Sequence, residues 1–278
     1  MTSFVDAVEL ACLQPIVDLL RSAVDDAIRY ILDGARTFRF DLTSPEVDSD
    51  ERSSVGTKLQ YHVIVQLKLL KEPPLDTKIM GIPVEIKGTV GSSWMIPREG
   101  QCQVTLLIRI DARKHRFRAL LMRTHRAWLG GGKGNQDLKR SPLAEGLANY
   151  ALEVAPWNEL PAEPLRSLTT EQLRVVFGSD GVRKRVTVLF GYLPETIIPR
   201  ASIATVATTR DDPLRRARQA KPHVLSEHDL VVLVGTWLSE RKAATQLGFY
   251  LGKKAWVVVR RTKLAAHGYT PDDFNHAS

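Results

Sequence analysis

The sequence predicts a mixed α/β (α+β) protein with two domains, the first built around a sheet and the second smaller and mostly helical. With 278 residues the chain is long enough for two domains that each bury a core. The predicted strands of the sheet lie before residue 125, whereas a series of short helices follows residue 166. Three prolines between 156 and 164 mark a linker between these regions. We therefore expect domains at 1–156 and 166–278, joined by a linker at 157–165.

The first 70 residues contain one clear helix and one ambiguous segment. Apolar residues recur from Ile16 to Leu32 at the i, i+3, i+4 spacing of an amphipathic helix, which we expect to serve packing. Residues 41–54 are acidic and rich in serine, so we expect a loop there. Between Lys58 and Leu70 the apolar spacing fits both a strand and one face of a helix, and periodicity leaves both open. Strands are predicted at 77–80, 84–89, 103–110 and 116–123.

The stretch 74–87 contains the residues with the clearest chemical potential. Asp76 is followed by eight residues and then by Glu85, Ile86 and Lys87. A glycine and a proline in the interval predict a bend between two short strands, so Asp76 and Glu85 can face each other across a hairpin. Because side chains in a strand alternate between faces, Glu85 and Lys87 should point the same way while Ile86 turns into the core.

This pattern suits the hydrolysis of a phosphate ester. Two converging carboxylates fit a hard divalent cation, and Mg²⁺ favours one or two carboxylates together with waters and phosphate oxygens. A lysine one step away can hold an attacking water and offset charge on the phosphate. The arrangement is the PD-(D/E)xK pattern of nucleases. The triplet alone is a weak signal, because such spacings arise often by chance, and a solvent-facing strand with alternating charges is the alternative.

Positive charge points to a polyanionic partner. The net charge is +8 and the isoelectric point is near 9.6, with basic residues concentrated at 109–140 and again in the C-terminal half. The glycine-rich stretch 130–134 lets the backbone approach a phosphate closely, although a plain flexible loop is the alternative. Ser141 as N-cap and Pro142 as first helical residue predict a helix to about Glu153. The candidate DNA-binding residues of this region are Lys133, Asn135, Lys139 and Arg140.

The C-terminal region resembles a DNA-binding module. Thr169 and Gln172 form a capping box for a helix to about Phe177. Short helices with a basic face are what a helix-turn-helix presents to DNA, and two strands after them fit a small winged-helix-like domain, although ordinary helical domains share this pattern. Helices are predicted at 182–192 and 199–207, joined by a short turn, then at 211–220 and around 240–247, with strands at 231–234 and 256–261. The candidate DNA-binding residues here are Arg210, Arg215, Arg216 and Arg218. The tail after Ala265 is expected to be poorly ordered.

Several classes of protein are disfavoured by the composition. Two cysteines, Cys12 and Cys102, cannot build a disulfide framework or a four-cysteine zinc site, so we expect a reducing compartment. The first 20 residues lack the basic start of a signal peptide, and no apolar run approaches the length of a membrane span. No arrangement for an activated serine or cysteine nucleophile is present. We therefore expect a cytoplasmic protein that does not associate with membranes.

Taken together, these motifs resemble one family over most of both domains. The residues that carry the resemblance are Gly56-Thr57, Asp76 with Glu85-Ile86-Lys87, Trp94-Met95-Ile96-Pro97 with Glu99, the run Asn135-Gln136-Asp137-Leu138-Lys139-Arg140, and Ile203-Ala204-Thr205-Val206-Ala207 with the basic run behind it. They resemble the NaeI family of restriction endonucleases, and as a set they are far more specific than the triplet alone. The resemblance implies an N-terminal restriction-endonuclease-like core of the PD-(D/E)xK type and a C-terminal winged-helix or helix-turn-helix DNA-binding domain.

The resemblance also implies roles for individual residues. Asp76 matches the first metal carboxylate and Lys87 the catalytic lysine, while Glu85 stands where a close relative has aspartate. The metal ligands would be Asp76, Glu85 and the carbonyl of Ile86. Gln60 stands where the family pattern has a glutamate on a helix, which favours the helix for the ambiguous segment and leaves two metal carboxylates instead of three. The resemblance further implies a Mg²⁺-dependent homodimer that binds a second DNA site as an effector.

These observations predict a Mg²⁺-dependent, homodimeric endonuclease that cuts double-stranded DNA to 5′-phosphate and 3′-hydroxyl ends in phage defence. Asp76, Glu85, Lys87 and Gln60 are the predicted catalytic residues. Two alternatives stay open. One is a modification-dependent or nicking repair nuclease, because base-edge contacts encode specificity and no motif here shows them. The other is a DNA-binding regulator with an inactivated nuclease domain, in which Gln60 is the first lost ligand.

Overall fold

The computed structural model describes residues 4–131, 138–178, 181–208 and 212–274. The chain divides into two compact units. Unit 1 comprises Met1–Leu32 and Asp41–Pro161, and unit 2 comprises Asp33–Phe40 and Ala162–Ser278. The change of unit after Pro161 falls inside the segment predicted as a linker, whereas the inclusion of Asp33–Phe40 in unit 2 has no counterpart in the sequence prediction.

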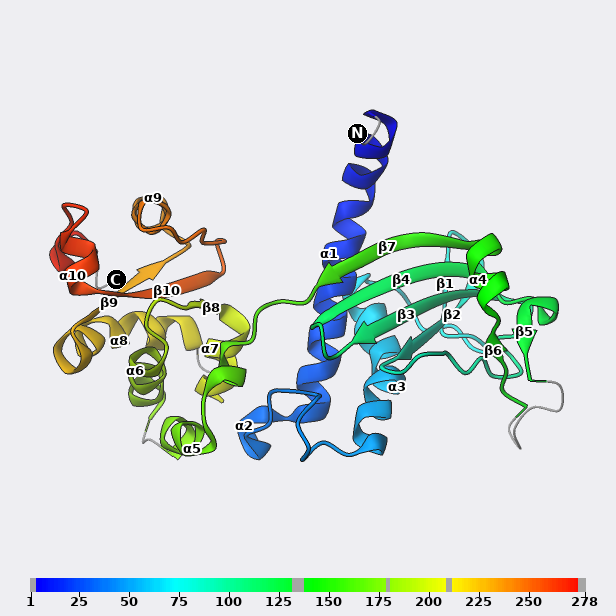
Figure 1. Cartoon of the computed structure of the whole chain (residues 1–278), viewed down its shortest axis with the longest axis horizontal. Helices are drawn as coiled ribbons and strands as arrows, with labels where there is room; N and C mark the ends of the chain where they lie inside the picture. Colours follow the sequence, from blue (N-terminus) through cyan, green and yellow to red (C-terminus); the bar gives the residue numbers. More distant parts are fainter. Residues whose placement is uncertain (1–3, 132–137, 179–180, 209–211, 275–278) are drawn as a thin grey trace. The chain divides into compact units, whose positions relative to one another are not determined.

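Unit 1 combines a mixed sheet with two long helices and several short elements (Figure 1). Among the described residues, the five-stranded sheet has the order β1-β2-β3-β4-β7; β2 and β3 are parallel and the other neighbours are antiparallel. The strands are β1 (Thr77–Ile79), β2 (Ile82–Thr89), β3 (Val104–Asp111), β4 (Arg116–Arg123) and β7 (Ala151–Glu159). The strands predicted between residues 77 and 123 are confirmed.

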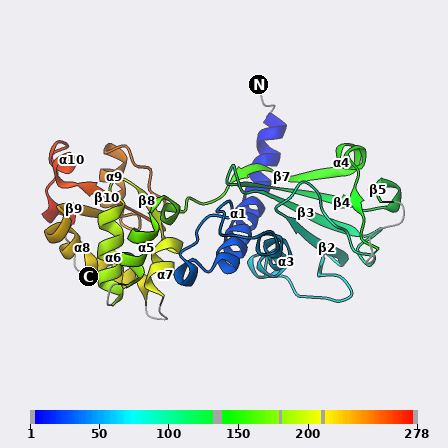
Figure 2. The same ribbon diagram turned by 60° about the horizontal axis from the view of Figure 1, so that its bottom comes forward.

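Helices α1 (Phe4–Leu32) and α3 (Ser49–Gln66) lie side by side against one face of this sheet (Figure 2). The predicted N-terminal helix is therefore confirmed. The ambiguous segment is helical through Gln66, because Val55, Leu59 and Val63 recur every four residues and are all fully buried. The loop predicted at 41–54 is wrong in its second half. Helix α3 begins at Ser49 because Asp48 caps it, its Oδ1 accepting the N–H of Glu51 at 2.7 Å.

The opposite face of the sheet carries a second apolar cluster. Trp94 and Ile96 of the segment between β2 and β3 pack there on Leu107 and Leu120, and the indole N–H of Trp94 donates to the Ile108 carbonyl at 3.0 Å. Around this cluster lie the short helices η1 (Arg126–Trp128) and α4 (Ala144–Tyr150) and the two-stranded ribbon of β5 (Leu129–Gly130) and β6 (Ser141–Pro142). The segment that returns from β2 to β3 is thus anchored over the sheet.

The region around residues 141–159 differs from its prediction. Ser141 and Pro142 form β6 instead of opening a helix, and α4 ends at Tyr150, where β7 begins. Pro156 therefore lies in a strand and not in a linker. An edge strand tolerates proline because one of its sides has no partner to hydrogen-bond, and the pairing of β7 with β4 is irregular around Ala155.

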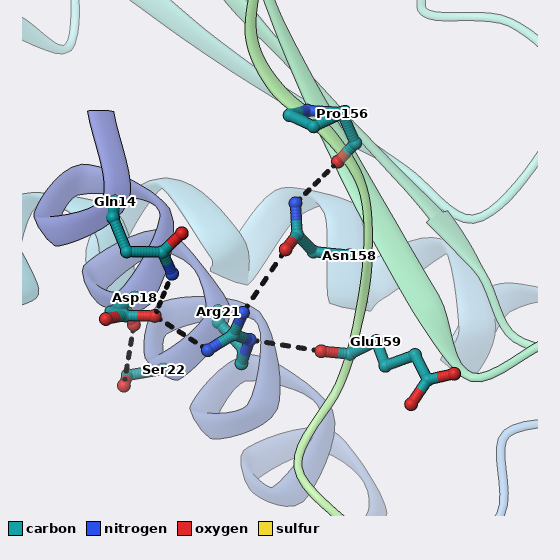
Figure 3. A network of polar contacts seen from close by, with 7 residues as sticks. All are labelled: Gln14, Asp18, Arg21, Ser22, Pro156, Asn158 and Glu159. Carbon is teal, nitrogen blue, oxygen red and sulfur yellow. Dashed lines mark hydrogen bonds and ion pairs between the residues drawn. The ribbon is translucent and has the colours of Figure 1, made fainter. Parts of the chain in front are cut away.

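A polar network fixes the end of β7 to α1 (Figure 3). Arg21 of α1 donates from Nε to the Glu159 carbonyl at 3.1 Å and from Nη2 to Asn158 Oδ1 at 3.3 Å. Its Nη1 contacts Asp18 Oδ1 at 2.7 Å, and Gln14 donates to the same oxygen. The guanidinium is therefore held in place where the chain leaves unit 1, and it occupies part of the free strand edge.

Unit 2 is a three-layer arrangement around a small sheet. Its sheet has the order β8-β10-β9 and is antiparallel. The elements are α2 (Gly34–Thr37), η2 (Pro164–Ser167), α5 (Thr170–Gly178), α6 (Val182–Tyr192), β8 (Ile197–Pro199), α7 (Arg200–Ala207), α8 (Pro213–His228), β9 (Leu230–Val234), α9 (Leu238–Gln246), β10 (Ala255–Arg260), α10 (Arg261–Ala265) and η3 (Pro271–Phe274). The capping box is confirmed, since Thr169 Oγ1 accepts the Gln172 N–H and Gln172 Oε1 accepts the Thr169 N–H.

Both faces of the small sheet are covered, which explains why every residue of β9 is apolar and buried. Val232 and Val234 face the cluster formed with α5 to α8, whereas Val231 and Leu233 face α9, α10 and η3. Figure 1 shows these helices on opposite sides of β9 and β10. The segment from α2 joins the first cluster, where Phe38 and Phe40 lie 5.6 and 6.1 Å from the ring centroid of Phe177.

Three predictions for unit 2 are wrong in detail. Helices α6 and α7 are separated by the strand β8 and not by a short turn alone. The basic helix α8 continues to His228, because its second half buries Lys221 and Val224. The tail is ordered through Phe274, which is 3% exposed and whose carbonyl accepts a hydrogen bond from Lys221 at 2.9 Å.

Within the described residues, none of the helices combines the length and apolarity needed to cross a membrane.

Candidate active site

The hairpin of β1 and β2 brings Asp76 and Glu85 together as predicted. Thr77 pairs with Val84 in the antiparallel register, so Asp76, one residue before β1, lies opposite Glu85. Asp76 is 7% exposed, and its Oδ2 accepts the backbone N–H of Ile86 at 2.8 Å. This bond fixes the carboxylate against the centre of β2.

Glu85 and Lys87 lie on the same face of β2, and Ile86 is buried on the other. Lys87 Nζ contacts Glu85 Oε1 at 2.7 Å. The Ile86 side chain is 1% exposed and packs in the core beneath α1 and α3. The alternation expected of a strand therefore places the two charged groups on one face, as predicted, and there they form an ion pair.

The environment of Glu85 favours its neutral form more than an exposed site would. Burial raises the pKa of Glu85 above its usual range, and the ion pair and hydrogen bond with Lys87 act in the opposite direction without cancelling the shift. The negative charges of Asp76 and Glu99 raise the pKa further. A positive charge that approaches Glu85 would lower this pKa and favour the ionised carboxylate.

A close backbone approach positions Glu85 from the side of the 91–103 segment. A Cβ atom added to Gly100 would lie 3.2 Å from Cγ of Glu85. The Gly100 carbonyl accepts a hydrogen bond from Thr124 Oγ1 at 2.7 Å, which fixes this glycine to the end of β4. The glutamate side chain is therefore confined between β2 and a fixed turn.

A second close approach positions Gln60. A Cβ atom on Gly56 would lie 2.5 Å from the carbonyl oxygen of Gly88, so α3 and β2 touch through two glycines. Gln60 is one turn further along the same face of α3, and it lines a groove together with Lys87. The structure thus places all four predicted catalytic residues around one short segment of β2.

The groove has a volume of about 710 Å³. One wall is formed by α3 from Ser49 to Gln60, and the other by the end of β2 and the segment after it. Its lining includes Ser49, Arg52, Ser53, Gly56, Thr57, Gln60, Ile86, Lys87, Gly88, Thr89, Val90, Gly91, Ser93, Met95, Pro97 and Lys139. Asp76 and Glu85 are not among these lining residues. They contact two residues that are, because Asp76 accepts the Ile86 N–H and Glu85 pairs with Lys87.

The predicted loop residues reach the same region in part. Ile96 and Arg140 exchange two backbone hydrogen bonds of 2.8 and 3.0 Å, which hold the base of the loop against the segment after β2. Lys139 lines the groove. The next residue, Arg140, is partly exposed. Lys133 and Asn135 lie outside the described residues.

The predicted arginines of unit 2 belong to a separate surface on α8. Arg215 is exposed, Arg216 donates from Nη1 to Gln219 at 3.1 Å, and Arg218 lies 4.0 Å from Asp212 with 27% of its side chain exposed. Arg210 lies outside the described residues.

The residues at the hairpin fit a hard divalent cation that retains water. Asp76, Glu85 and the Ile86 carbonyl supply oxygen donors, which suit Mg²⁺. Among the described residues there is no group of three or more histidine, cysteine, aspartate or glutamate side chains that could enclose a metal ion. An ion held here would therefore depend on waters or on oxygens of a bound phosphate for its remaining ligands.

Sequence reasoning missed the features that set the geometry. The contact of Gly56 with Gly88 and the packing of Gly100 on Glu85 depend on residues distant in sequence. Arg52 and Ser93 also line the groove without having been predicted. The one available signal was the Asp48 cap with Glu51 three residues later, which places Arg52 in a helix facing the same way as Gly56.

A mixed sheet flanked by helices, with an acidic pair and a lysine beside a groove, is consistent with a restriction-endonuclease-like fold. The sequence matches the family described as restriction endonuclease NaeI over residues 7–273. It is also 25% identical over 267 residues to the type II restriction enzyme NaeI of Lentzea aerocolonigenes, covering 93% of this chain and 83% of that protein.

The chain belongs to the NaeI family of restriction endonucleases. The family resemblance inferred from sequence motifs is therefore confirmed. Membership places the protein among the site-specific deoxyribonucleases of type II restriction, enzymes that bind double-stranded DNA and cleave it at particular sequences.

Proposed function

We propose that this chain is a Mg²⁺-dependent endonuclease that hydrolyses both strands of DNA with Asp76, Glu85 and Lys87. The observation that carries the proposal is the ion pair of Glu85 and Lys87 on the same strand that donates its Ile86 N–H to Asp76. Two buried carboxylates and one ammonium group are thereby held within one hairpin beside an open groove.

Each group has a distinct task in this proposal. Asp76, Glu85 and the Ile86 carbonyl hold the cation, which when bound supplies Lewis-acid activation of a phosphate oxygen and of a water. Lys87 donates a hydrogen bond that orients the attacking water and offsets the charge that develops on the phosphate. Gln60 brings an uncharged amide, whose carbonyl oxygen can accept from a water and whose NH₂ can donate to phosphate.

The reaction balances as a simple hydrolysis. The water oxygen forms a bond to phosphorus, the bond from phosphorus to the 3′ oxygen breaks, and the leaving 3′ oxygen takes a proton. The products are a 5′-phosphate and a 3′-hydroxyl. Preorganised groups in this site must supply most of the large reduction in barrier that phosphodiester hydrolysis requires.

Unit 2 is proposed to bind DNA through helix α8. Its arginines at 215, 216 and 218 lie on a helix that follows α7 after a short interval, as in a helix-turn-helix, and a small sheet packs against these helices, as in a winged-helix-like domain. A homodimer, simultaneous binding of two DNA sites, and a cytoplasmic location complete the proposal. The family resemblance motivates the first two of these, and the composition motivates the third.

One observation favours a second function. Gln60 supplies no charge, and the described residues contain no group of three acidic side chains that could enclose a metal ion. A chain with this site could retain DNA binding as a regulator after losing cleavage. A single measurement distinguishes the nuclease from the regulator, because only the nuclease cuts DNA when a metal ion is present.

The test is incubation of the full chain with supercoiled and linear plasmid DNA, both unmethylated and methylated, with and without Mg²⁺. We expect discrete Mg²⁺-dependent fragments whose ends can be mapped, and we expect Lys87→Ala to abolish them while still retarding DNA on a gel. Retardation without cutting by the wild-type chain under every divalent cation would replace the nuclease with the regulator.

A further inference from the structure

The groove of unit 1 extends from Lys87 to the start of α3 and includes further basic residues. Arg52 stands in the first turns of α3, and Lys139 reaches the same groove from the base of the loop. No aspartate or glutamate is among the described residues that line it. Three basic residues, Arg52, Lys87 and Lys139, therefore line one groove, and Lys87 is paired there with Glu85.

Arg52 is held in position by the backbone. Its Nε donates to the Asp48 carbonyl at 3.2 Å, which directs the guanidinium along the start of α3. The helix itself cannot shift easily, because Gly56, four residues later, touches the Gly88 carbonyl of β2. The arginine is thus presented from a rigid element, in fixed relation to the strand that carries Lys87.

The remaining polar lining consists of small hydroxyl groups. Ser49, Ser53 and Thr57 come from α3, and Ser93 comes from the opposite wall. Hydroxyl and guanidinium groups together are typical contacts for the oxygens of a nucleic-acid backbone, and they carry no information about base identity. The lining offers few surfaces on which a base could stack, since it contains no aromatic residue among those described.

The length of the groove matches more than one phosphate. Arg52 and Gln60 are eight residues apart, which is about 12 Å along a helix. One strand of B-DNA advances about 3.4 Å along the helix axis for each phosphate, so the span exceeds the distance covered by a single phosphate. A strand that crosses Lys87 and continues along α3 would bring a later phosphate to Arg52.

We propose that this groove is a backbone-binding track, in which Arg52 contacts a phosphate a few nucleotides from the one that is cleaved. The proposal rests on the proposed function, because Lys87 defines where the cleaved phosphate lies. Arg52 acts as a positioning residue. Its contact holds the strand in register with the hairpin and takes no part in the chemistry.

The salt dependence of DNA binding tests the contact directly. Binding of a duplex that contains the mapped cleavage sequence would be measured without Mg²⁺ at several salt concentrations. Losing one phosphate contact should reduce the slope of log affinity against log salt by about 0.9. We expect Arg52→Ala to show this reduction and Arg113→Ala to keep the wild-type slope. Arg113 is a matched control, since it is exposed in the turn between β3 and β4 and does not line the groove.

Neutral phosphates locate the contact. A series of duplexes, each with one methylphosphonate in place of a phosphate, should reveal a position a few nucleotides from the cut at which wild-type binding weakens. The same replacement should cause no further loss in Arg52→Ala. An unchanged salt slope in Arg52→Ala, or full additivity of the two changes at every position, would overturn the proposal.

The two proposals fail in different ways. If Lys87→Ala still cuts DNA, the chemistry assigned to the hairpin is wrong, and a reduced salt slope in Arg52→Ala would still establish the groove as a DNA track. If Lys87→Ala abolishes cutting but Arg52→Ala binds with the wild-type slope, the hairpin stands and the track does not. Binding is measured without cleavage, so neither readout depends on the other.

Discussion

Each unit contains a lysine and a glutamate that form a short ion pair away from bulk solvent, and the two pairs differ in what surrounds them. In unit 1, Lys87 and Glu85 are 2.7 Å apart with side-chain exposures of 25% and 5%. In unit 2, Lys221 and Glu240 are 2.8 Å apart with exposures of 6% and 0%. Lys87 faces a groove, whereas Lys221 is enclosed by protein.

The enclosed pair has its hydrogen bonds satisfied from several elements. Lys221 also donates to the Phe274 carbonyl, its ammonium lies 4.7 Å from the ring centroid of Trp237, and Glu240 accepts the Val234 N–H. These contacts join α8, α9, the end of β9 and η3. The open pair has fewer such contacts, which leaves its charges able to respond to a substrate.

In both pairs, burial outweighs the attraction between the partners. Desolvation raises the pKa of Glu85 and lowers the pKa of Lys221, so each shift favours the neutral form. The role of a buried lysine–glutamate pair therefore cannot be inferred from its length and burial alone. A pair that borders a groove can take part in a reaction, whereas a pair whose hydrogen bonds are all made within the protein stabilises the fold.

The strongest test of the open pair is Glu85→Gln. We expect cleavage to fall by roughly 100-fold or more, because one of two anionic cation ligands is lost. The measurement is the rate of plasmid cutting at saturating Mg²⁺, with Lys114→Ala, an exposed change in the turn after β3, as the control. Cutting at close to the wild-type rate would remove Glu85 from the site.

The same variant should become more stable at neutral pH. The folded-state pKa of Glu85 is raised, so its contribution to stability is fully present below the ordinary glutamate pKa of about 4.3 and is lost as pH rises through the folded value. Glu85→Gln removes that loss. We expect its Tm to exceed that of the wild type at pH 7 and the difference to vanish toward pH 4. A lower Tm at pH 7 would show that the bond to Lys87 outweighs burial.

The enclosed pair should respond in stability. Lys221→Ala leaves a buried glutamate without its cation, which costs about 3–5 kcal/mol in comparable buried pairs. Lys184→Ala provides the matched control, because its pair with Glu227 is equally short at 2.6 Å but has side-chain exposures of 51% and 36%. That change should cost far less stability, because solvent screens an exposed ion pair. Urea unfolding with hydrogen exchange in β9 would measure both, and equal losses would erase the distinction drawn from burial.

The contact of α3 with β2 determines whether the open pair has its groove. Gly56→Ala places a methyl group 2.5 Å from the Gly88 carbonyl oxygen, so we expect a loss of about 1–3 kcal/mol in stability. Cleavage should fall by up to about 100-fold, because a displacement near 1 Å misaligns reacting groups.

The control for this change is another glycine-to-alanine substitution. Gly178, the last residue of α5, has open space where its Cβ would be, so Gly178→Ala should change stability by less than about 1 kcal/mol and leave cutting unaffected. Normal cutting by Gly56→Ala would show that α3 can move without harm to the site.

The sequence predicted the local parts of this site better than the assembled site. Glu85 and Lys87 on one face follow from the period of a strand, and the capping box of α5 follows from two residues three apart. The contact between Gly56 and Gly88 cannot be predicted from any local pattern, because the two glycines are distant in sequence. The C-terminal tail was missed for the same reason, since its order depends on Lys221, 53 residues away.

The boundary between helix and strand at residues 141–159 shows a different limit. Ser141 and Pro142 carry a valid signal for a helix start, but pairing with Leu129 and Gly130 turns them into a strand. Tertiary pairing overrode the local preference there. Likewise, three closely spaced prolines indicated a linker, although Pro156 lies within an edge strand.

Gln60→Glu gives the smallest expected effect and the sharpest test of how the open pair works. A third carboxylate at the groove should lower the Mg²⁺ concentration required for half-maximal cutting by roughly tenfold, which corresponds to about 1.4 kcal/mol of cation binding. Calorimetric titration of Mg²⁺ without DNA would measure the same change apart from catalysis. Gln60→Ala serves as the control, because it removes the amide without adding charge. If both variants bind Mg²⁺ as the wild type does, Gln60 lies too far from the cation to matter. If the wild type binds DNA without cutting and Gln60→Glu restores cleavage, the missing charge is the reason for the inactivity, and the regulator becomes the natural role of the chain.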